Sequence, residues 1–299
     1  MITKKVGEWL EIIIPHDWKG LSLEYVLRDI VQVPKQLLHQ YRMEKSVKIN
    51  GEVLSWNTAL TPNQKLQLHL FIEEEFDVEP EFSPDLHILF EDDHLLIANK
   101  PAGMDTHPNE KGQIGTLSNM IAYHLQMNGV LTKVRHVHRL DRDTTGAVLF
   151  AKHKLASAIL DRRLENREIK RTYVALVHGL FKQKKGRIDA AIGRDRHHPT
   201  RRRVSPTGQK AISNYKLIKT IPSKNMSLVE LELQTGRTHQ IRVHMSHLGF
   251  PLVGDTLYGG KPLVPRQALH AVRIQLQHPI TNELITCEAP FLDDPPIFE

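Results

Sequence analysis

Residues 138–150 read His-Arg-Leu-Asp-Arg-Asp-Thr-Thr-Gly-Ala-Val-Leu-Phe, a charged run that leads through a turn into an apolar segment. Four charges fall within five positions: Arg139, Asp141, Arg142 and Asp143. The Thr-Thr-Gly that follows supplies turn residues, and the apolar residues after it predict a buried strand. A carboxylate beside arginines stays ionised, which suits a nucleophile or a base better than an acid. The charge pattern alone nevertheless favours a surface ion-pair cluster.

Outward from this run, short β-branched or apolar stretches predict a strand-rich region. Strands are expected at residues 88–90, 95–98, 147–151, 172–177 and 228–233, and helices at 117–127 and 155–168. The pattern begins near Leu86 and continues without an internal repeat. The sequence therefore predicts one large mixed α/β domain at 86–299.

Residues 1–72 form a separate small α/β unit in the sequence pattern. Helices are expected over 23–30 and 37–41, two strands joined by an Asn-Gly turn over 47–53, and a third strand over 66–70. The Val-Lys-Ile-Asn-Gly run at 47–51 resembles the S4 RNA-binding domain, although Ser22-Leu23-Glu24 stands where that family has Arg-Leu-Asp. Both RNA binding and a purely structural role are open for this unit.

Charge is distributed unevenly along the chain. An acidic segment at 73–85 carries two prolines and no helical or strand period, so we expect a linker there. Residues 73–97 contain ten acidic side chains and no Lys or Arg, whereas residues 131–219 contain 23 Lys or Arg against 7 Asp or Glu. The net charge of +6 thus hides a strongly basic middle, which favours an anionic partner.

Several classes of protein do not fit this sequence. A single cysteine, Cys287, leaves no intramolecular disulfide and no cysteine-rich zinc site. The first residues carry scattered charges without an apolar core, so no signal peptide is expected, and no run of apolar residues is long enough to predict a membrane span. We expect a cytoplasmic monomer that contacts no membrane.

Five motifs, in order, resemble those of the RluA-type pseudouridine synthases, a family that isomerises uridine in RNA. The run at 138–146 is similar to the signature that holds their catalytic aspartate. The other motifs lie at 88–93 with 99–103 and 107–108, at 170–177, at 235–244, and at 251–259 with 268–271. The likeness covers about residues 86–290. It implies a mixed α/β fold around a large, mainly antiparallel sheet, preceded by the S4-like unit.

The resemblance assigns three catalytic positions. Asp141 corresponds to the aspartate that acts on the sugar or the base, and Tyr173 to the tyrosine that removes the C5 proton. Arg237 corresponds to the arginine that pairs with the aspartate, a role that suits a planar guanidinium because it can bind both carboxylate oxygens. Without the resemblance, Tyr173 would be interpreted as a core residue. Isomerisation involves no net redox change or hydrolysis, so we expect neither a cofactor nor a metal.

RNA contacts are expected mainly from arginines. Arg139 corresponds to the side chain that fills the gap left by a flipped base. The polar run at 194–203 is followed by a turn, and we expect a loop that grips the RNA backbone. The full set of expected RNA contacts is Arg139, Arg142, Arg194, Arg201, Arg202, Arg203 and Arg242. The histidines at 136, 138, 239 and 244 are expected to be structural or RNA-facing rather than metal ligands.

Two other functions compete with this interpretation. A non-catalytic RNA-binding or ribosome-assembly protein would have no need of Asp141, Tyr173 and Arg237 together. A nucleoside hydrolase or base glycosylase normally uses two positioned carboxylates, and Asp143 is the only second candidate nearby in sequence. Among RNA substrates we favour 23S ribosomal RNA over transfer RNA, because an S4-like unit precedes the catalytic domain.

Overall fold

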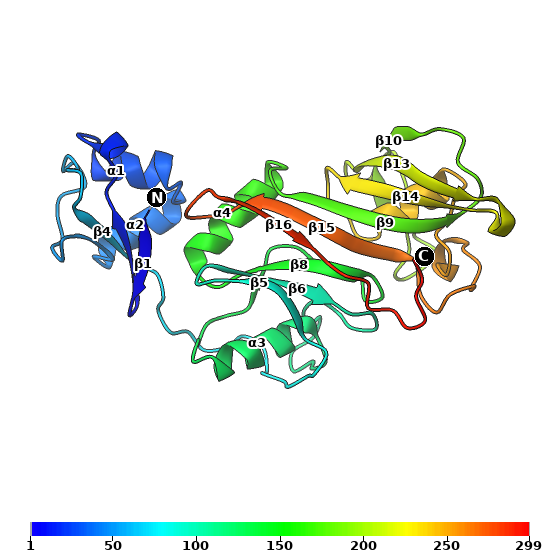
Figure 1. The fold of residues 1–299 in the computed structure, drawn as a ribbon, viewed down its shortest axis with the longest axis horizontal. Coiled ribbons are helices and arrows are strands. Elements are labelled where there is room, and N and C mark those ends of the chain that lie inside the picture. The colour runs from blue at the N-terminus through cyan, green and yellow to red at the C-terminus, as the bar shows by residue number, and fades with distance from the viewer. Residues whose placement is uncertain (1, 299) are drawn as a thin grey trace.

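The structure is a computed structural model that describes residues 2–298, and two β-sheets dominate it (Figure 1). The smaller sheet has the strand order β1-β2-β4-β3. Its strands are β1 (Thr3–Val6), β2 (Trp9–Ile13), β3 (Val47–Ile49) and β4 (Lys65–His69). One face packs against the short helix α1 (Leu23–Tyr25), the π-turn η2 (Val26–Ile30) and α2 (Lys35–Met43), and the 3-10 turn η1 (His16–Trp18) closes the unit.

The larger sheet has ten strands. Eight follow the order β10-β13-β14-β9-β15-β8-β6-β5, with β16 paired to β15 and β7 to β8. Their bounds are β5 (His87–Glu91), β6 (Leu95–Lys100), β7 (Arg135–His136), β8 (Thr145–Ala151), β9 (Lys170–His178), β10 (Lys185–Asp189), β13 (Ile212–Ile221), β14 (Met226–Leu233), β15 (Leu269–Gln277) and β16 (Leu284–Glu288). Among residues 2–298, β15 with β8 is the one parallel pair in this sheet, so the predicted large, mainly antiparallel sheet is confirmed.

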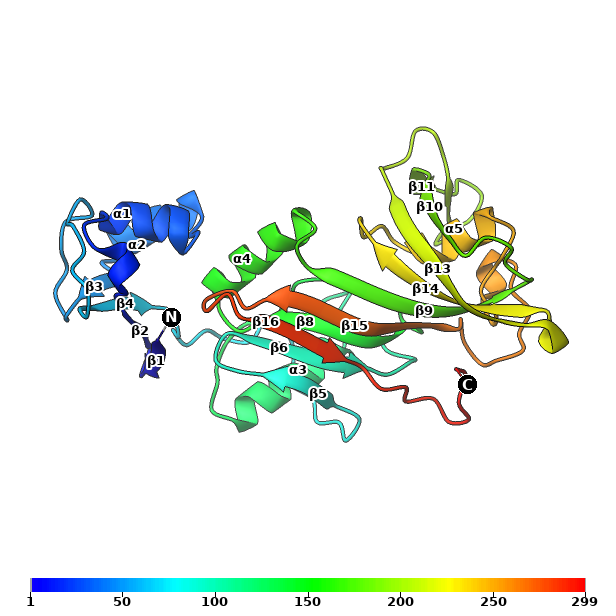
Figure 2. The ribbon, with the colours of Figure 1, turned by 45° about the horizontal axis from the view of Figure 1, so that its top comes forward.

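The central strands β6 and β8 are buried throughout and mostly apolar because both faces of the sheet are covered. Successive side chains of a strand point to opposite faces. One set, including Leu96 and Phe150, packs under α3 (Leu117–Met127), and the other, including Ile97 and Leu149, packs under α4 (Lys154–Glu165). Helix α4 also contributes to the core of the small unit, beside which it lies in Figures 1 and 2.

Most predicted elements are present, with small shifts at their ends. The helix expected at 117–127 is α3, and the one expected at 155–168 is α4, which ends three residues earlier. The Asn-Gly turn forms with positive φ at both Asn50 and Gly51, but the strand expected after it is reduced to a single bridge between Ile49 and Glu52. No helix within residues 2–298 has the length and apolar character needed to cross a bilayer.

The arginine-rich run that we expected as a loop is instead a short hairpin. Strands β11 (Ile192–Arg194) and β12 (Arg202–Val204) pair with each other, and only 195–201 connects them irregularly. Val204 and Ile192 pack against Val243 of α5 (Gln240–His247), which explains why so polar a run acquires regular structure. The 3-10 turns η3 (Pro222–Lys224) and η4 (Thr256–Tyr258) complete this end of the molecule, opposite the small unit (Figure 2).

The acidic segment at 73–85 has no helix or strand, as expected of a linker, yet it is fixed to the larger unit. Glu74 forms ion pairs with Arg135 and Lys154, and the Asn119 side chain of α3 donates a hydrogen bond to the carbonyl of Glu79. Phe76 and Val78 also pack on the α3 core. The segment therefore lies along the surface of the larger unit.

Candidate active site

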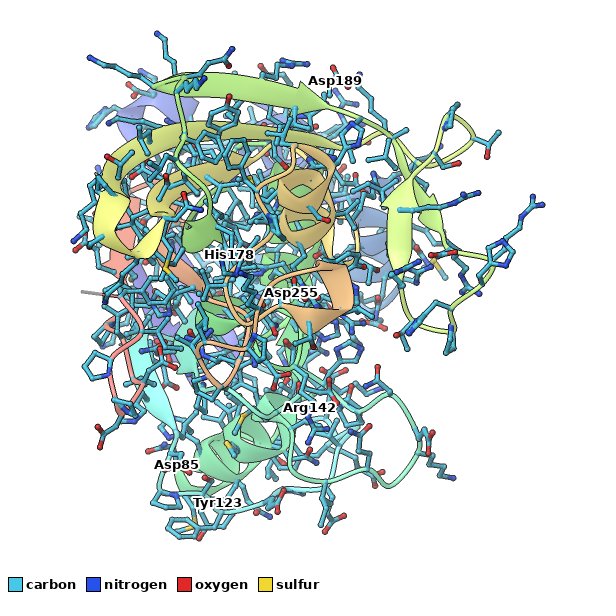
Figure 3. All side chains as sticks on the ribbon, turned by 90° about the vertical axis from the view of Figure 1, so that its right-hand side faces the viewer. Asp85, Tyr123, Arg142, His178, Asp189 and Asp255 are labelled. Carbon is cyan, nitrogen blue, oxygen red and sulfur yellow. The ribbon has the colours of Figure 1, made fainter. Side chains whose placement is uncertain are left out.

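A cavity of about 540 Å³ opens at the centre of the larger unit, where three segments from distant parts of the sequence meet. Residues 137–141 form one wall, β9 forms the floor, and residues 233–242 form the opposite wall on the way into α5. Figure 3 views the molecule from the side that faces right in Figure 1, and labels Arg142 and Asp255.

Asp141 lies on the wall of this cavity and is held by a buried arginine. Arg242 Nη1 lies 3.3 Å from Asp141 Oδ2, while its Nε and Nη2 donate to the two oxygens of Asp255 at 2.8 and 2.9 Å. Arg242 is 8% exposed and Asp255 is 2% exposed. Burial alone would lower the pKa of Arg242, but Asp255 and Asp141 raise it above its ordinary value. The guanidinium thus stays charged and fixes one oxygen of Asp141.

The structure pairs Asp141 with Arg242 instead of Arg237, which the sequence led us to expect there. Arg242, which we expected to contact RNA, is buried between Asp141 and Asp255. Arg237 is exposed and donates to the Lys210 carbonyl and to Gln209 Oε1. Arg237 and Arg242 both lie in the motif at 235–244, and their positions in that motif do not show which of them pairs with Asp141. Arg242 could have been recognised because its neighbours in α5 are buried, and a buried arginine requires a carboxylate.

Tyr173 lies on β9 at the floor of the cavity and is buried. Burial raises the pKa of its hydroxyl above the ordinary value, the positive charge of Arg171 lowers it, and Asp141 raises it again. No hydrogen-bond partner for this hydroxyl lies among residues 2–298. Tyr173, on a strand, and Asp141, on a loop, are thus brought to the same cavity from segments that are distant in sequence.

The loop that carries Asp141 is held from below by a buried lysine that we did not expect in the site. Lys100 Nζ, at the end of β6, donates to the carbonyls of Pro101, Met104 and Arg142 at 2.9, 2.8 and 2.7 Å. Burial lowers the pKa of Lys100 to about 7, against the opposing effect of Asp143 and other nearby carboxylates. A lysine that directly follows the apolar run 95–98 and Asn99 was the sequence signal for this support.

Strand β8, which follows this loop, fits closely against β15 at its glycine. Gly146 has a φ of 113°, and a Cβ there would lie 2.3 Å from the backbone oxygen of Ala271. Leu140 is fixed in addition by Thr106, whose Oγ1 donates to its carbonyl and accepts from its amide. These contacts define the backbone on both sides of Asp141.

His239 connects the carboxylate of Asp141 to the β11–β12 hairpin. Its Nε2 lies 3.9 Å from Asp141 Oδ2, and its Nδ1 lies 2.8 Å from the Tyr258 hydroxyl. That hydroxyl accepts a hydrogen bond from the amide of Arg202 in β12. His239 adopts a left-handed conformation, with a φ of 58°, at the residue before α5. His239 thus makes a structural contact and also lines the cavity. The buried His138 accepts a hydrogen bond from the Leu149 amide.

The arginines expected on RNA differ in their surroundings. Arg139 and Arg142 are exposed beside Asp141, which agrees with an RNA-facing position. On the hairpin, Arg194 and Arg203 are exposed, whereas Arg201 is paired with Asp195. Arg194 and Arg202 are direct partners in the antiparallel ladder. The hairpin projects from the body of the molecule (Figure 3).

Comparisons with known proteins agree on one family. The model described as RNA pseudouridylate synthase matches residues 94–247, and that of the RluD ribosomal pseudouridine synthase N-terminal domain matches residues 10–66. The chain is 52% identical to the uncharacterized RNA pseudouridine synthase YhcT of Bacillus subtilis, over 96% of this chain and 95% of that one. It is 38% identical to the ribosomal large subunit pseudouridine synthase D of Pasteurella multocida, over 92% and 89%. The structure of human RNA Pseudouridylate Synthase Domain Containing 1 superposes with a TM-score of 0.58 at 26% identity, over 72% of this chain and 86% of that one.

Proposed function

The chain belongs to the RNA pseudouridylate synthase family, and we propose that it isomerises uridine in 23S ribosomal RNA with Asp141 as its catalytic carboxylate. The observation that carries the site assignment is the position of Asp141 on a cavity wall, fixed by an arginine that is itself bound to a second buried carboxylate. Ribosomal RNA is favoured by similar proteins that are named ribosomal large subunit pseudouridine synthase D.

The reaction breaks the bond between the sugar and the base, turns the base, and joins its C5 atom to the sugar. Asp141 supplies the carboxylate that starts this sequence, by attack on the sugar or the base or by removal of a sugar proton. Arg242 keeps that carboxylate oriented, because one of its nitrogens donates to Asp141 and two donate to Asp255. Tyr173 receives the C5 proton once the new bond has formed. No step leaves a net change in oxidation state.

The target base must leave its stack before it can enter the cavity, at a cost of a few kcal/mol. Arg139 is exposed close to Asp141 in the sequence, and its planar guanidinium can stack in the gap that the flipped base leaves in the RNA. The hairpin favours an anionic partner for a separate reason. Arg194 and Arg202 face each other across its ladder, and like charges in that position are destabilising unless an anion lies between them. Residues 1–72 would extend this RNA contact, with 86–299 as the catalytic domain.

Mapping pseudouridine in RNA from strains with and without this chain tests the proposed function. Loss of specific sites from 23S ribosomal RNA supports it, whereas loss from transfer RNA would change the substrate. A second assay follows the release of tritium from RNA that contains [5-³H]uridine, because C5 loses its hydrogen. Release of free uracil instead would indicate a hydrolase, and no reaction on RNA from the deletion strain would indicate a non-catalytic RNA-binding protein.

Replacing Tyr173 with Phe is expected to slow tritium release by about 100-fold or more, the range for loss of a proton-transfer group. Only the hydroxyl is removed, and it has no hydrogen-bond partner among residues 2–298, so the melting temperature should not fall. Tyr215→Phe is a matched control, because that buried tyrosine lies outside the cavity. Normal turnover in Tyr173→Phe would assign Tyr173 to the core.

Neutralising the hairpin through Arg194→Gln, Arg202→Gln and Arg203→Gln should flatten the salt dependence of RNA binding. Three lost phosphate contacts reduce the slope of log affinity against log salt by about 2, at about 0.7 per contact on single strands. Arg201 is left in place because it pairs with Asp195. Arg139→Ala is the contrasting variant: it should slow turnover with little change in slope. An unaltered slope in the triple variant would place the hairpin away from the RNA.

A further inference from the structure

Arg171 is a buried arginine without a partner. It lies on β9 two residues before Tyr173, so both side chains project from the same face of the strand, towards the cavity. It is 9% exposed, and its Nε is buried without a hydrogen-bond partner. Within residues 2–298, Nη1 and Nη2 likewise have neither a hydrogen-bond acceptor nor an ion-pair partner. An arginine is always charged, and such residues are almost never buried unless they are paired. A partner for this charge must therefore come from outside the chain, from water in the free protein or from a ligand that enters the cavity.

The head of Arg171 reaches across the cavity to its opposite wall. A Cβ built on Gly236 would lie 3.3 Å from Nη1 and 3.8 Å from Nη2 of Arg171. The guanidinium thus lies beside the turn that leads into α5, where the absence of a side chain at Gly236 leaves room for it. Asp141, Arg171 and Tyr173 all line this cavity. The charges of Asp141 and Arg171 both affect the pKa of the Tyr173 hydroxyl.

Arg163 is a second buried arginine of this protein, and its hydrogen bonds can be compared with the surroundings of Arg171. It is 6% exposed, and thus as well buried as Arg171. Its Nη1 donates to the carbonyls of Gln277 and His278 at 2.7 and 3.1 Å, and its Nη2 donates to Asn282 Oδ1 at 2.7 Å. The fold therefore supplies acceptors for a buried arginine that stabilises it, and it supplies none for Arg171.

We propose that Arg171 binds a phosphate group flanking the target uridine once that nucleotide has entered the cavity. The inference rests on the proposed function, because it assumes an RNA substrate in this cavity. A phosphate fits better than a base carbonyl, because it neutralises the buried charge and its oxygens can accept hydrogen bonds from two nitrogens of the planar guanidinium. A carbonyl would accept hydrogen bonds but leave the charge uncompensated. Binding at Arg171 would then place the sugar and base between Asp141 and Tyr173.

The test compares Arg171→Met with the matched variant Arg163→Met. Arg171→Met should weaken binding of in vitro transcribed ribosomal RNA by about tenfold, as for a lost charged hydrogen bond, and lower the salt slope by about 0.7. Its melting temperature should stay the same or rise, because an uncompensated buried charge is removed. Arg163→Met should show the reverse: a lower melting temperature and unchanged RNA affinity. If Arg171→Met melts lower as Arg163→Met does, or binds RNA normally, the proposal is overturned.

Two further measurements identify the group that is bound. Uridine 3′,5′-bisphosphate should inhibit tritium release by the intact protein more strongly than uridine, and this preference should disappear in Arg171→Met. Arg171→Lys should recover part of the affinity, because lysine keeps the positive charge but cannot donate two parallel hydrogen bonds as a guanidinium does. A shifted pH profile with unchanged affinity would mean that Arg171 acts on Tyr173 instead. Tritium release by the unaltered protein tests the proposed function separately, so the two failures can be told apart.

Discussion

Asp141→Asn is expected to lower tritium release from ribosomal RNA by about 10⁴-fold or more, the scale seen when an essential base or nucleophile is lost. The amide keeps the size of the side chain but has neither the charge nor the basicity that the first step requires. RNA affinity should stay within a few-fold, because most of it comes from phosphate contacts elsewhere. The fold should also survive, since Arg242 keeps both of its hydrogen bonds to Asp255.

The neighbouring carboxylate provides the control for this variant. Asp143 belongs to the same charged run, but it does not line the cavity, so Asp143→Asn should retain turnover within about tenfold. Thermal unfolding of both proteins would show that neither result comes from loss of structure. If Asp141→Asn kept a tenth of normal turnover, Asp141 could not be the catalytic carboxylate. Equal losses in the two variants would mean that the run acts as a unit rather than through one residue.

The fold was predictable where the sequence carries a clear period. Strands β6 and β8 are covered on both faces and therefore read as continuous apolar runs, and α3 shows helical spacing along its whole length. Strand β1 was not predicted, because Lys4 and Lys5 sit in it and only its pairing with β2 makes it a strand. The β11–β12 hairpin was not predicted for the same reason, since its order comes from packing on α5. Such elements form because of contacts between segments that are distant in sequence, and the local hydrophobic pattern does not predict those contacts.

The site was predictable only as far as motif position determines it. The sequence identified Asp141 and Tyr173 as candidates, and both line one cavity. It did not identify Lys100 or Arg171, because each acts through groups that are distant in sequence or come from outside the chain. The choice between Arg237 and Arg242 shows the same limit. Two arginines five residues apart look equivalent in sequence, whereas burial separates them in the structure.

Arg242→Met is expected to destabilise the protein by about 3–5 kcal/mol, the usual result of breaking a buried ion pair from one side. Asp255 is 2% exposed, and without Arg242 its carboxylate would be left in the interior without its cation. Asp141 would lose its fixed oxygen at the same time, so turnover should fall by about 100-fold or more even under conditions where the variant is folded. Denaturant unfolding measures the first effect, and tritium release per folded molecule measures the second.

Two further variants separate the effect on the fold from the effect on the site. Arg242→Lys keeps the charge next to Asp255 but cannot bridge two carboxylates, so it should recover much of the stability and little of the turnover. Arg237→Met removes the other arginine of the motif, which is exposed and bound to Gln209 and Lys210, and its stability should change by less than about 0.5 kcal/mol. If Arg237→Met lost turnover as completely as Arg242→Met while Arg242→Lys stayed active, Arg237 would have to move onto Asp141 when RNA binds. The pairing implied by the family resemblance would then describe the complex, and the pairing with Arg242 the free protein.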